Sequence, residues 1–268
     1  MALVRVERSH EGRAATVTLS RPDVRNALSL PMLAELTDAF GDLAVDRQVR
    51  AVVLAGDGPD FCAGADLAEL EAARSRGSAG ALDFDAPFRD ALRAIAAHPA
   101  PVIARVQGRA LGGGCQLVLA CDLAVATRDA SLGIPSARLG VVIPFDSVRR
   151  LVLAIGPKRA GEVLYTARTA SGDEAQAWGL VTRAVQALEL DEAVDELVEH
   201  VIAGAPMSVR ASKRGIALAS DGTAAGREVE LTGATDYDLM AANALAGEDL
   251  GEGIAAFRER RPPEFGGR

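Results

Sequence analysis

Aromatic residues are scarce in this sequence, and its few cysteines are not spaced as pairs. Phe, Trp and Tyr make up only 4% of the 268 residues, so we expect a core of small aliphatic side chains that favours close helix packing. The three cysteines, Cys62, Cys115 and Cys121, show no Cys-x-x-Cys spacing. We therefore expect no metal site and no disulfide framework, but free buried thiols in a reducing compartment.

The sequence also lacks basic clusters and long apolar runs. The formal net charge is −8 at pH 7 and there is no run of Lys and Arg, so nucleic acid is not an expected partner. No apolar run is long enough to span a membrane. Arg5 and Glu7 interrupt the N-terminal segment, where a secretory signal would be apolar. With 49% apolar residues, these features predict a globular cytoplasmic protein.

Glycine, in contrast, is concentrated in residues 101–122. This stretch contains an expected strand at 101–104, a turn at Gly108, and three glycines at 112–114 directly before an apolar helical pattern. The first amides of a helix have no partner within it, and glycine allows a ligand to approach them. The pattern predicts either a cradle for an anion or a developing oxyanion, or a tight crossing that needs glycine only for packing.

Strand and helix patterns alternate along the first part of the chain, and helices dominate the rest. The expected elements of the first part are a hairpin over 3–19, a helix capped by Ser29, a strand at 49–54, a helix ending near 75, a loop at 76–84, and a helix from about 85 to 97. This order predicts an α/β fold with a core at residues 1–200 and a helical region at 201–268.

Four motifs occur along the chain in the order and spacing of a known family. They are Arg-Asn-Ala-Leu at 25–28, Ala-Gly-Ala-Asp-Leu at 63–67, Gly-Gly-Gly-Cys-Gln-Leu at 112–117 and Gly-Leu-Val at 179–181. With them the chain resembles the crotonase (enoyl-CoA hydratase/isomerase) superfamily over nearly its whole length. The resemblance implies a spiral of ββα units and a C-terminal helical region that forms homotrimers or dimers of trimers. It also implies an acyl-CoA thioester as substrate or ligand, with no permanently bound cofactor.

The resemblance further implies an oxyanion hole made by the backbone N–H groups of Ala65 and Gly113. Two preorganised donors aimed at one thioester oxygen would stabilise an enolate, and losing one such donor typically costs about 3–4 kcal/mol. The residues that the resemblance places around CoA lie in two loops and in the tail helix, and they are Arg25, Ala27, Ala63, Ala65, Phe257 and Arg260. A solvated arginine and a core phenylalanine are the alternatives for the two tail residues.

Both glutamates that hydratases of this family use are replaced here, by Gln116 and Ser136. A glutamine amide does not exchange protons near neutral pH, and a serine hydroxyl needs a base of its own. Asp146 is a candidate for proton transfer, since other members of the superfamily use an Asp in this segment. Alternatively, Asp146 is a cap or first-turn residue of the helix expected from about Ser147.

These replacements leave two hypotheses. The first is an enzyme of fatty-acid or acyl-CoA metabolism, a lyase or isomerase whose oxyanion hole stabilises an enolate. Isomerisation or decarboxylation is favoured over hydration, because neither needs an activated water. The second is a non-catalytic acyl-CoA-binding protein. In both, the acyl chain is expected to contact the region at 68–95, including Leu70, Leu82, Phe84 and Phe88.

Overall fold

The computed structural model describes residues 2–75, 77–223 and 231–267, and their side chains except those of 77–83, 221–223 and 231–236. Its centre is a six-stranded sheet in the order β1-β2-β3-β4-β6-β9, in which β1 and β2 are antiparallel and the other neighbours are parallel. These strands are β1 (Val4–Ser9), β2 (Ala14–Leu19), β3 (Ala51–Gly56), β4 (Val102–Val106), β6 (Leu123–Thr127) and β9 (Arg183–Val185). A three-stranded sheet contains β5 (Arg109–Leu111), β7 (Ser131–Gly133) and β8 (Ala170–Ser171).

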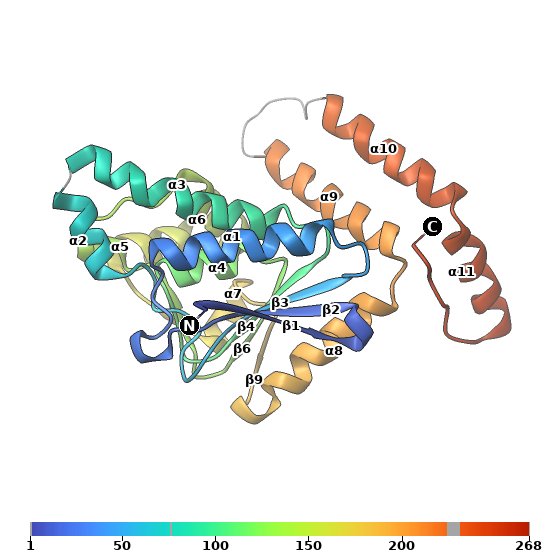
Figure 1. Cartoon of the computed structure of the whole chain (residues 1–268), viewed down its shortest axis with the longest axis horizontal. Coiled ribbons are helices and arrows are strands. Elements are labelled where there is room, and N and C mark those ends of the chain that lie inside the picture. Colours follow the sequence, from blue (N-terminus) through green and yellow to red (C-terminus); the bar gives the residue numbers. More distant parts are fainter. Residues whose placement is uncertain (1, 76, 224–230, 268) are drawn as a thin grey trace.

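Helices cover both faces of the six-stranded sheet (Figure 1). Side chains of successive strand residues point to opposite faces, so Val52 and Leu54 of β3 enter the larger core, and Ala51 and Val53 enter the smaller one. The helix that covers the smaller core is α8 (Leu190–Ala203). The larger core is covered by α1 (Leu30–Val45), α3 (Gly77–Ala96), α4 (Gly113–Ala120) and α6 (Phe145–Thr166). The remaining helices before α8 are α2 (Leu67–Ser75), α5 (Ser136–Leu139) and α7 (Gly172–Trp178).

The local sequence patterns account for most of these elements. The expected hairpin is present, and Ser29 caps α1 by accepting a hydrogen bond at 3.5 Å from the Met32 N–H. The expected loop at 76–84 is wrong over its described residues, because α3 begins at Gly77. Phe84 and Phe88 of this helix are buried, and packing of α3 against α1 and α2 outweighs the low helix propensity of its first residues.

The tail consists of α9 (Pro206–Thr223), α10 (Leu231–Ala246) and α11 (Glu248–Glu259), and it extends away from the sheet (Figure 1). Lys213 of α9 ties it to the core, since its ammonium group donates to Asp122 Oδ2 at 2.7 Å and to Ala100 O at 3.1 Å. The same Asp122 oxygen accepts the Val102 N–H at 2.7 Å. None of the described helices is both long and apolar enough to cross a membrane. The division at residue 200 and the trimer stay predictions.

Candidate functional site

Two loops that are distant in the sequence run side by side at one end of the sheet. The Ala63 N–H donates to Arg25 O at 2.9 Å, and the Leu28 N–H donates to Gly64 O at 2.8 Å. Leu28 and Ala65 then form an isolated parallel β-bridge. The structure therefore brings together the expected CoA residues of the first two motifs, including the exposed Arg25, whose Nε lies 3.7 Å from Asp60 Oδ2.

Asn26 and Arg21 hold these loops in place. Asn26 has a φ of 54° and is fully buried, and its Nδ2 donates to the carbonyls of residues 57 and 60 at 2.9 Å. Arg21 donates to Ala27 O at 2.6 Å and to Asp66 Oδ2 at 3.0 Å. The other oxygen of Asp66 accepts the Ala68 N–H at 3.0 Å, so Asp66 also caps α2. Sequence reasoning missed the Arg21–Asp66 pair.

The three glycines cross the 62–65 segment at very short range. A Cβ on Gly114 would lie 2.2 Å from the carbonyl oxygen of Cys62. Gly64 has a φ of +101°, and a Cβ there would lie 2.7 Å from Leu111 O. Packing alone therefore requires glycine at these two positions. Gly113 differs, because a Cβ added there would contact Cδ1 of the Leu28 side chain at 2.9 Å and would lie 3.5 Å from the Ala65 nitrogen.

The backbone N–H groups of Ala65 and Gly113 share two properties. Their nitrogens lie near one another. A Cβ added to Gly113 would lie 3.5 Å from the Ala65 nitrogen, and a Cβ added to Gly64 would lie 3.2 Å from the Gly113 nitrogen. Neither N–H has a hydrogen-bond acceptor among the described residues. Gly113 is the first residue of α4, where the helix dipole favours negative charge. Chemically, this arrangement is suited to an oxyanion.

Gln116 lies three residues after Gly113 and therefore on the same side of α4. The residue is only 5% exposed, and its Oε1 has no hydrogen-bond partner within the described part of the chain. Leaving a buried acceptor unpaired costs about 1–3 kcal/mol. A ligand that donates a hydrogen bond to this oxygen would recover that cost.

The other two candidates for proton chemistry lie at helix starts. Ser136 is half-buried and is the first residue of α5. Asp146 is exposed and lies in the first turn of α6. This position is the one expected if Asp146 stabilises the start of the helix. A role for either residue in proton transfer stays a prediction.

The cysteines beside the glycine crossing add no nucleophile. Burial raises the pKa of Cys62 and of Cys115 to about 12, and Cys62 Sγ donates to Asn26 O at 3.1 Å. Both are therefore thiols at neutral pH. The expected free buried thiols are confirmed for these two residues, and Cys121 is free and partly buried.

Aromatic side chains of α3 approach Gly113 from the apolar side. Phe84 and Phe88 stack with their ring centroids 6.2 Å apart, and a Cβ on Gly113 would lie 3.4 Å from Phe88 Cε2. Leu70 packs partly buried against the same core. The side chain of Leu82 lies outside the described residues. An acyl-chain contact in this region stays a prediction.

The tail residues expected at CoA are not brought to these loops within one chain. Phe257 of α11 is 86% exposed, and Arg260 is the C-cap residue directly after this helix, with a φ of 54°. Figure 1 shows α11 and α2 at opposite ends of the long axis of the molecule. The interpretation of Phe257 as a core residue is therefore wrong for the single chain.

Comparisons with known proteins identify relatives along nearly the whole chain. Residues 10–268 match the family described as enoyl-CoA hydratase/isomerase. A putative enoyl-CoA hydratase of Thermus thermophilus is 39% identical, over 98% of this chain and 100% of that protein. The mitochondrial enoyl-CoA hydratase domain-containing protein 2 of Homo sapiens is 37% identical, over 94% of this chain and 85% of that protein. The crystal structure of an enoyl-CoA hydratase/carnithine racemase from Magnetospirillum magneticum has a TM-score of 0.90 at 34% identity, covering 100% of this chain and 97% of that one. This chain, with its crotonase fold, belongs to the enoyl-CoA hydratase/isomerase family.

Proposed function

We propose that the protein binds an acyl-CoA thioester and stabilises the enolate of its acyl group between the N–H groups of Ala65 and Gly113. The supporting observation is that these two donors lie near one another and lack an acceptor among the described residues. When the bond to the α carbon breaks, its electron pair moves onto the thioester oxygen, and both N–H groups would donate hydrogen bonds to this oxygen. Each such donor typically contributes about 2.7–4 kcal/mol in the transition state.

We expect isomerisation or decarboxylation rather than hydration, although several relatives are named hydratases. Hydration needs one group that deprotonates water and another that protonates the α carbon, and Gln116 and Ser136 are poor substitutes for such carboxyl groups. Decarboxylation needs no base, because the electron pair released with CO₂ enters the enolate directly. Isomerisation needs one group that removes a proton and returns it to another carbon, and Asp146 is our candidate for this role.

A screen of CoA thioesters tests this proposal. The protein would be incubated with enoyl-, β-keto- and malonyl-type CoA thioesters, with products identified by mass spectrometry and binding recorded by calorimetry. In D₂O, enolate formation also places deuterium on the α carbon of a saturated acyl-CoA, so enolisation is visible even without product. Asp146→Asn should slow proton transfer by about 10²–10⁴-fold. Unchanged deuterium uptake in this variant would remove Asp146 from the mechanism.

The buried Oε1 of Gln116 favours a second candidate, an acyl-CoA-binding protein without turnover. A buried amide oxygen that is unpaired among the described residues can recognise a ligand without exchanging protons. Tight binding with neither product nor deuterium uptake would select this candidate. Absence of any binding would contradict both functions.

We also propose a homotrimer or a dimer of trimers in which the tail of one copy reaches the CoA of another, since one chain cannot bring Arg260 to Arg25. Arg260→Glu should weaken CoA binding, and Arg258→Glu tests the other candidate arginine, in the last turn of α11. Light scattering would give the mass of the assembly. A monomer that binds CoA with full affinity would contradict this arrangement. The free thiols suit a reducing compartment such as the cytoplasm.

A further inference from the structure

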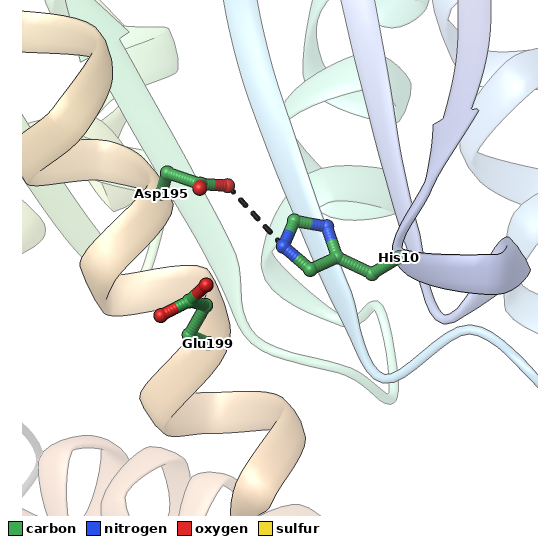
Figure 2. A group of neighbouring side chains, drawn as sticks. All are labelled: His10, Asp195 and Glu199. Carbon is green, nitrogen blue, oxygen red and sulfur yellow. Dashed lines mark ion pairs between the residues drawn. The ribbon is translucent and has the colours of Figure 1, made fainter.

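A second group of titratable side chains lies on the face of the sheet that α8 covers. His10 belongs to η1 (His10–Gly12), the turn between β1 and β2, and Asp195 and Glu199 belong to α8 (Figure 2). One ligand atom of each residue lies within 4.8 Å of the other two. Nε2 of His10 is 3.3 Å from Oδ1 of Asp195. The loops around Ala65 are part of the opposite layer, so this group is separate from the proposed CoA site.

The charges of this group are not balanced by the rest of the described chain. Asp195 and Glu199 are four residues apart on α8 and therefore repel one another on one side of the helix. Asp195 forms an ion pair with His10 alone, and Glu199 has no ion pair with any described residue. In contrast, Glu196 of the same helix pairs with Arg183 at 2.6 Å. A bound cation would convert the repulsion into a shared attraction.

The imidazole of His10 is oriented for such a cation. Its backbone has a φ of 52°, and its side chain is only 23% exposed. Ser9 Oγ lies 3.0 Å from Nδ1. When this hydroxyl accepts the Nδ1–H, the lone pair of the other nitrogen is available to a metal. Here the other nitrogen is Nε2, which faces the carboxylate of Asp195 (Figure 2).

The donor atoms and their spacing indicate which class of cation fits. An imidazole nitrogen with two carboxylate oxygens suits Zn²⁺ and similar ions, whereas Mg²⁺ and Ca²⁺ prefer oxygen alone. With Zn²⁺ bonds of about 2.0–2.1 Å, two ligands of a tetrahedral ion are about 3.3 Å apart, which matches the distance between Nε2 and Oδ1. The Glu199 oxygen lies within 4.8 Å of both atoms, and rotation of its exposed side chain would bring it to the ion. A cavity of about 420 Å³ between the sheet and α8 is lined by His10 and Asp195. It leaves room for a water as the fourth ligand.

We propose that His10, Asp195 and Glu199 bind one divalent cation of the Zn²⁺ class, with its fourth position open to this cavity. The ion joins the β1–β2 turn to α8 and so connects the start of the sheet to the last helix that packs on it. This site does not depend on the acyl-CoA chemistry proposed above.

Titration with Zn²⁺ tests the proposal on the full chain after dialysis against a chelator, with a chromogenic indicator as competitor. We expect one equivalent to bind per chain. His10→Ala, Asp195→Asn and Glu199→Gln should each lower the affinity by more than about tenfold, since even loss of an outer-sphere partner typically costs about 10–100-fold. His200→Ala is the matched control, because the one carboxylate paired with this histidine of α8 among the described residues is that of Glu196, with Oε1 at 3.9 Å. It should bind Zn²⁺ as the wild type does.

His98 and the thiols do not compete in this measurement. His98 is 2% exposed, and burial raises the pKa of all three cysteines, so their thiols are protonated at neutral pH. A second readout is the unfolding temperature. It should rise with Zn²⁺ in the wild type and in His200→Ala, but not in Asp195→Asn, whose isosteric and exposed side chain leaves the fold unchanged. Absence of Zn²⁺ binding by the wild type, or wild-type affinity in His10→Ala and Asp195→Asn, would overturn the proposal.

Discussion

Replacement of Gly113 by alanine should separate chemistry from folding in the proposed oxyanion hole. A Cβ at this position would stand 3.5 Å from the Ala65 nitrogen and, by covalent geometry, about 2.5 Å from the nitrogen of residue 113 itself. A thioester oxygen that accepts from both N–H groups must lie about 2.7–3.1 Å from each nitrogen. Because the methyl group and the oxygen would both lie beside the Ala65 nitrogen, we predict that the methyl group crowds the oxygen.

The magnitude of each effect follows from the contacts of this methyl group. It would lie 2.9 Å from Leu28 Cδ1, the far end of a flexible side chain. Replacement of glycine also restricts the unfolded chain, which is worth about 0.4–1 kcal/mol. Because Leu28 is fully buried and Phe88 Cε2 would lie 3.4 Å from the methyl group, the core is also overpacked. We therefore expect a net loss of about 1–2 kcal/mol in the free energy of unfolding. Stabilisation of the enolate should fall by about 2.7–4 kcal/mol, or about 10²–10³-fold in rate.

The assay is deuterium uptake at the α carbon of an acyl-CoA, with thermal unfolding measured on the same samples. Gly114→Ala is the matched control, because its Cβ would lie 2.2 Å from the backbone oxygen of Cys62 and should destabilise the fold by about 1–3 kcal/mol or more. If the protein binds without turnover, the affinity for an acyl-CoA is compared with that for a thioether analogue that lacks the carbonyl. A folded Gly113→Ala protein with wild-type uptake, or with the wild-type preference for the carbonyl, would refute the oxyanion hole.

Three further changes test the surroundings of the site. Lys213→Met removes the bond to Asp122 and should lower the free energy of unfolding by about 1–3 kcal/mol in urea titrations; an unchanged midpoint would contradict this. Burial lowers the pKa of His98 below its ordinary value of 6.5, so the unfolded chain takes up a proton that the folded protein does not, and stability should fall as the pH drops through about 6.5. His98→Gln should flatten this part of the stability profile, and an equal slope in both proteins would assign it to other groups. Arg21→Met breaks the pair with Asp66 and should weaken acyl-CoA binding in calorimetry with no change in the circular dichroism spectrum; full affinity would show that the pair does not position the loops.

Elements with a local signal could be predicted from the sequence, and elements that depend on distant partners could not. The cap at Ser29 and the glycines before α4 are local signals of a helix start, and both helices begin there. The strand β5 has only three residues, and it exists because it pairs with β7. The start of α3 was missed for a similar reason, since its glycines and serine form a helix only where the helix packs on others.

The same distinction applies to the functional residues. Ala65 and Gly113 occur in motifs, so their proximity could be anticipated from the family resemblance. The pair between Arg21 and Asp66 could not, because an arginine in a loop and an acid at a helix start have no spacing that links them. The expectation of no metal site rested on cysteine spacing, whereas His10 and its two carboxylates come from segments far apart in the chain. Only the fold places them together.

The bond between Lys213 and Asp122 bears on how the tail can be studied. Asp122 follows the end of α4 within two residues, and its carboxylate also accepts the Val102 N–H at the start of β4. Deletion of the tail would therefore leave a carboxylate without its cation directly behind the helix whose first residue is Gly113. Loss of ligand binding in a truncated protein would then mix two causes, the missing contact of the tail with CoA and a disturbed α4. Point substitutions in α11 avoid this ambiguity, because they leave α9 and its anchor in place.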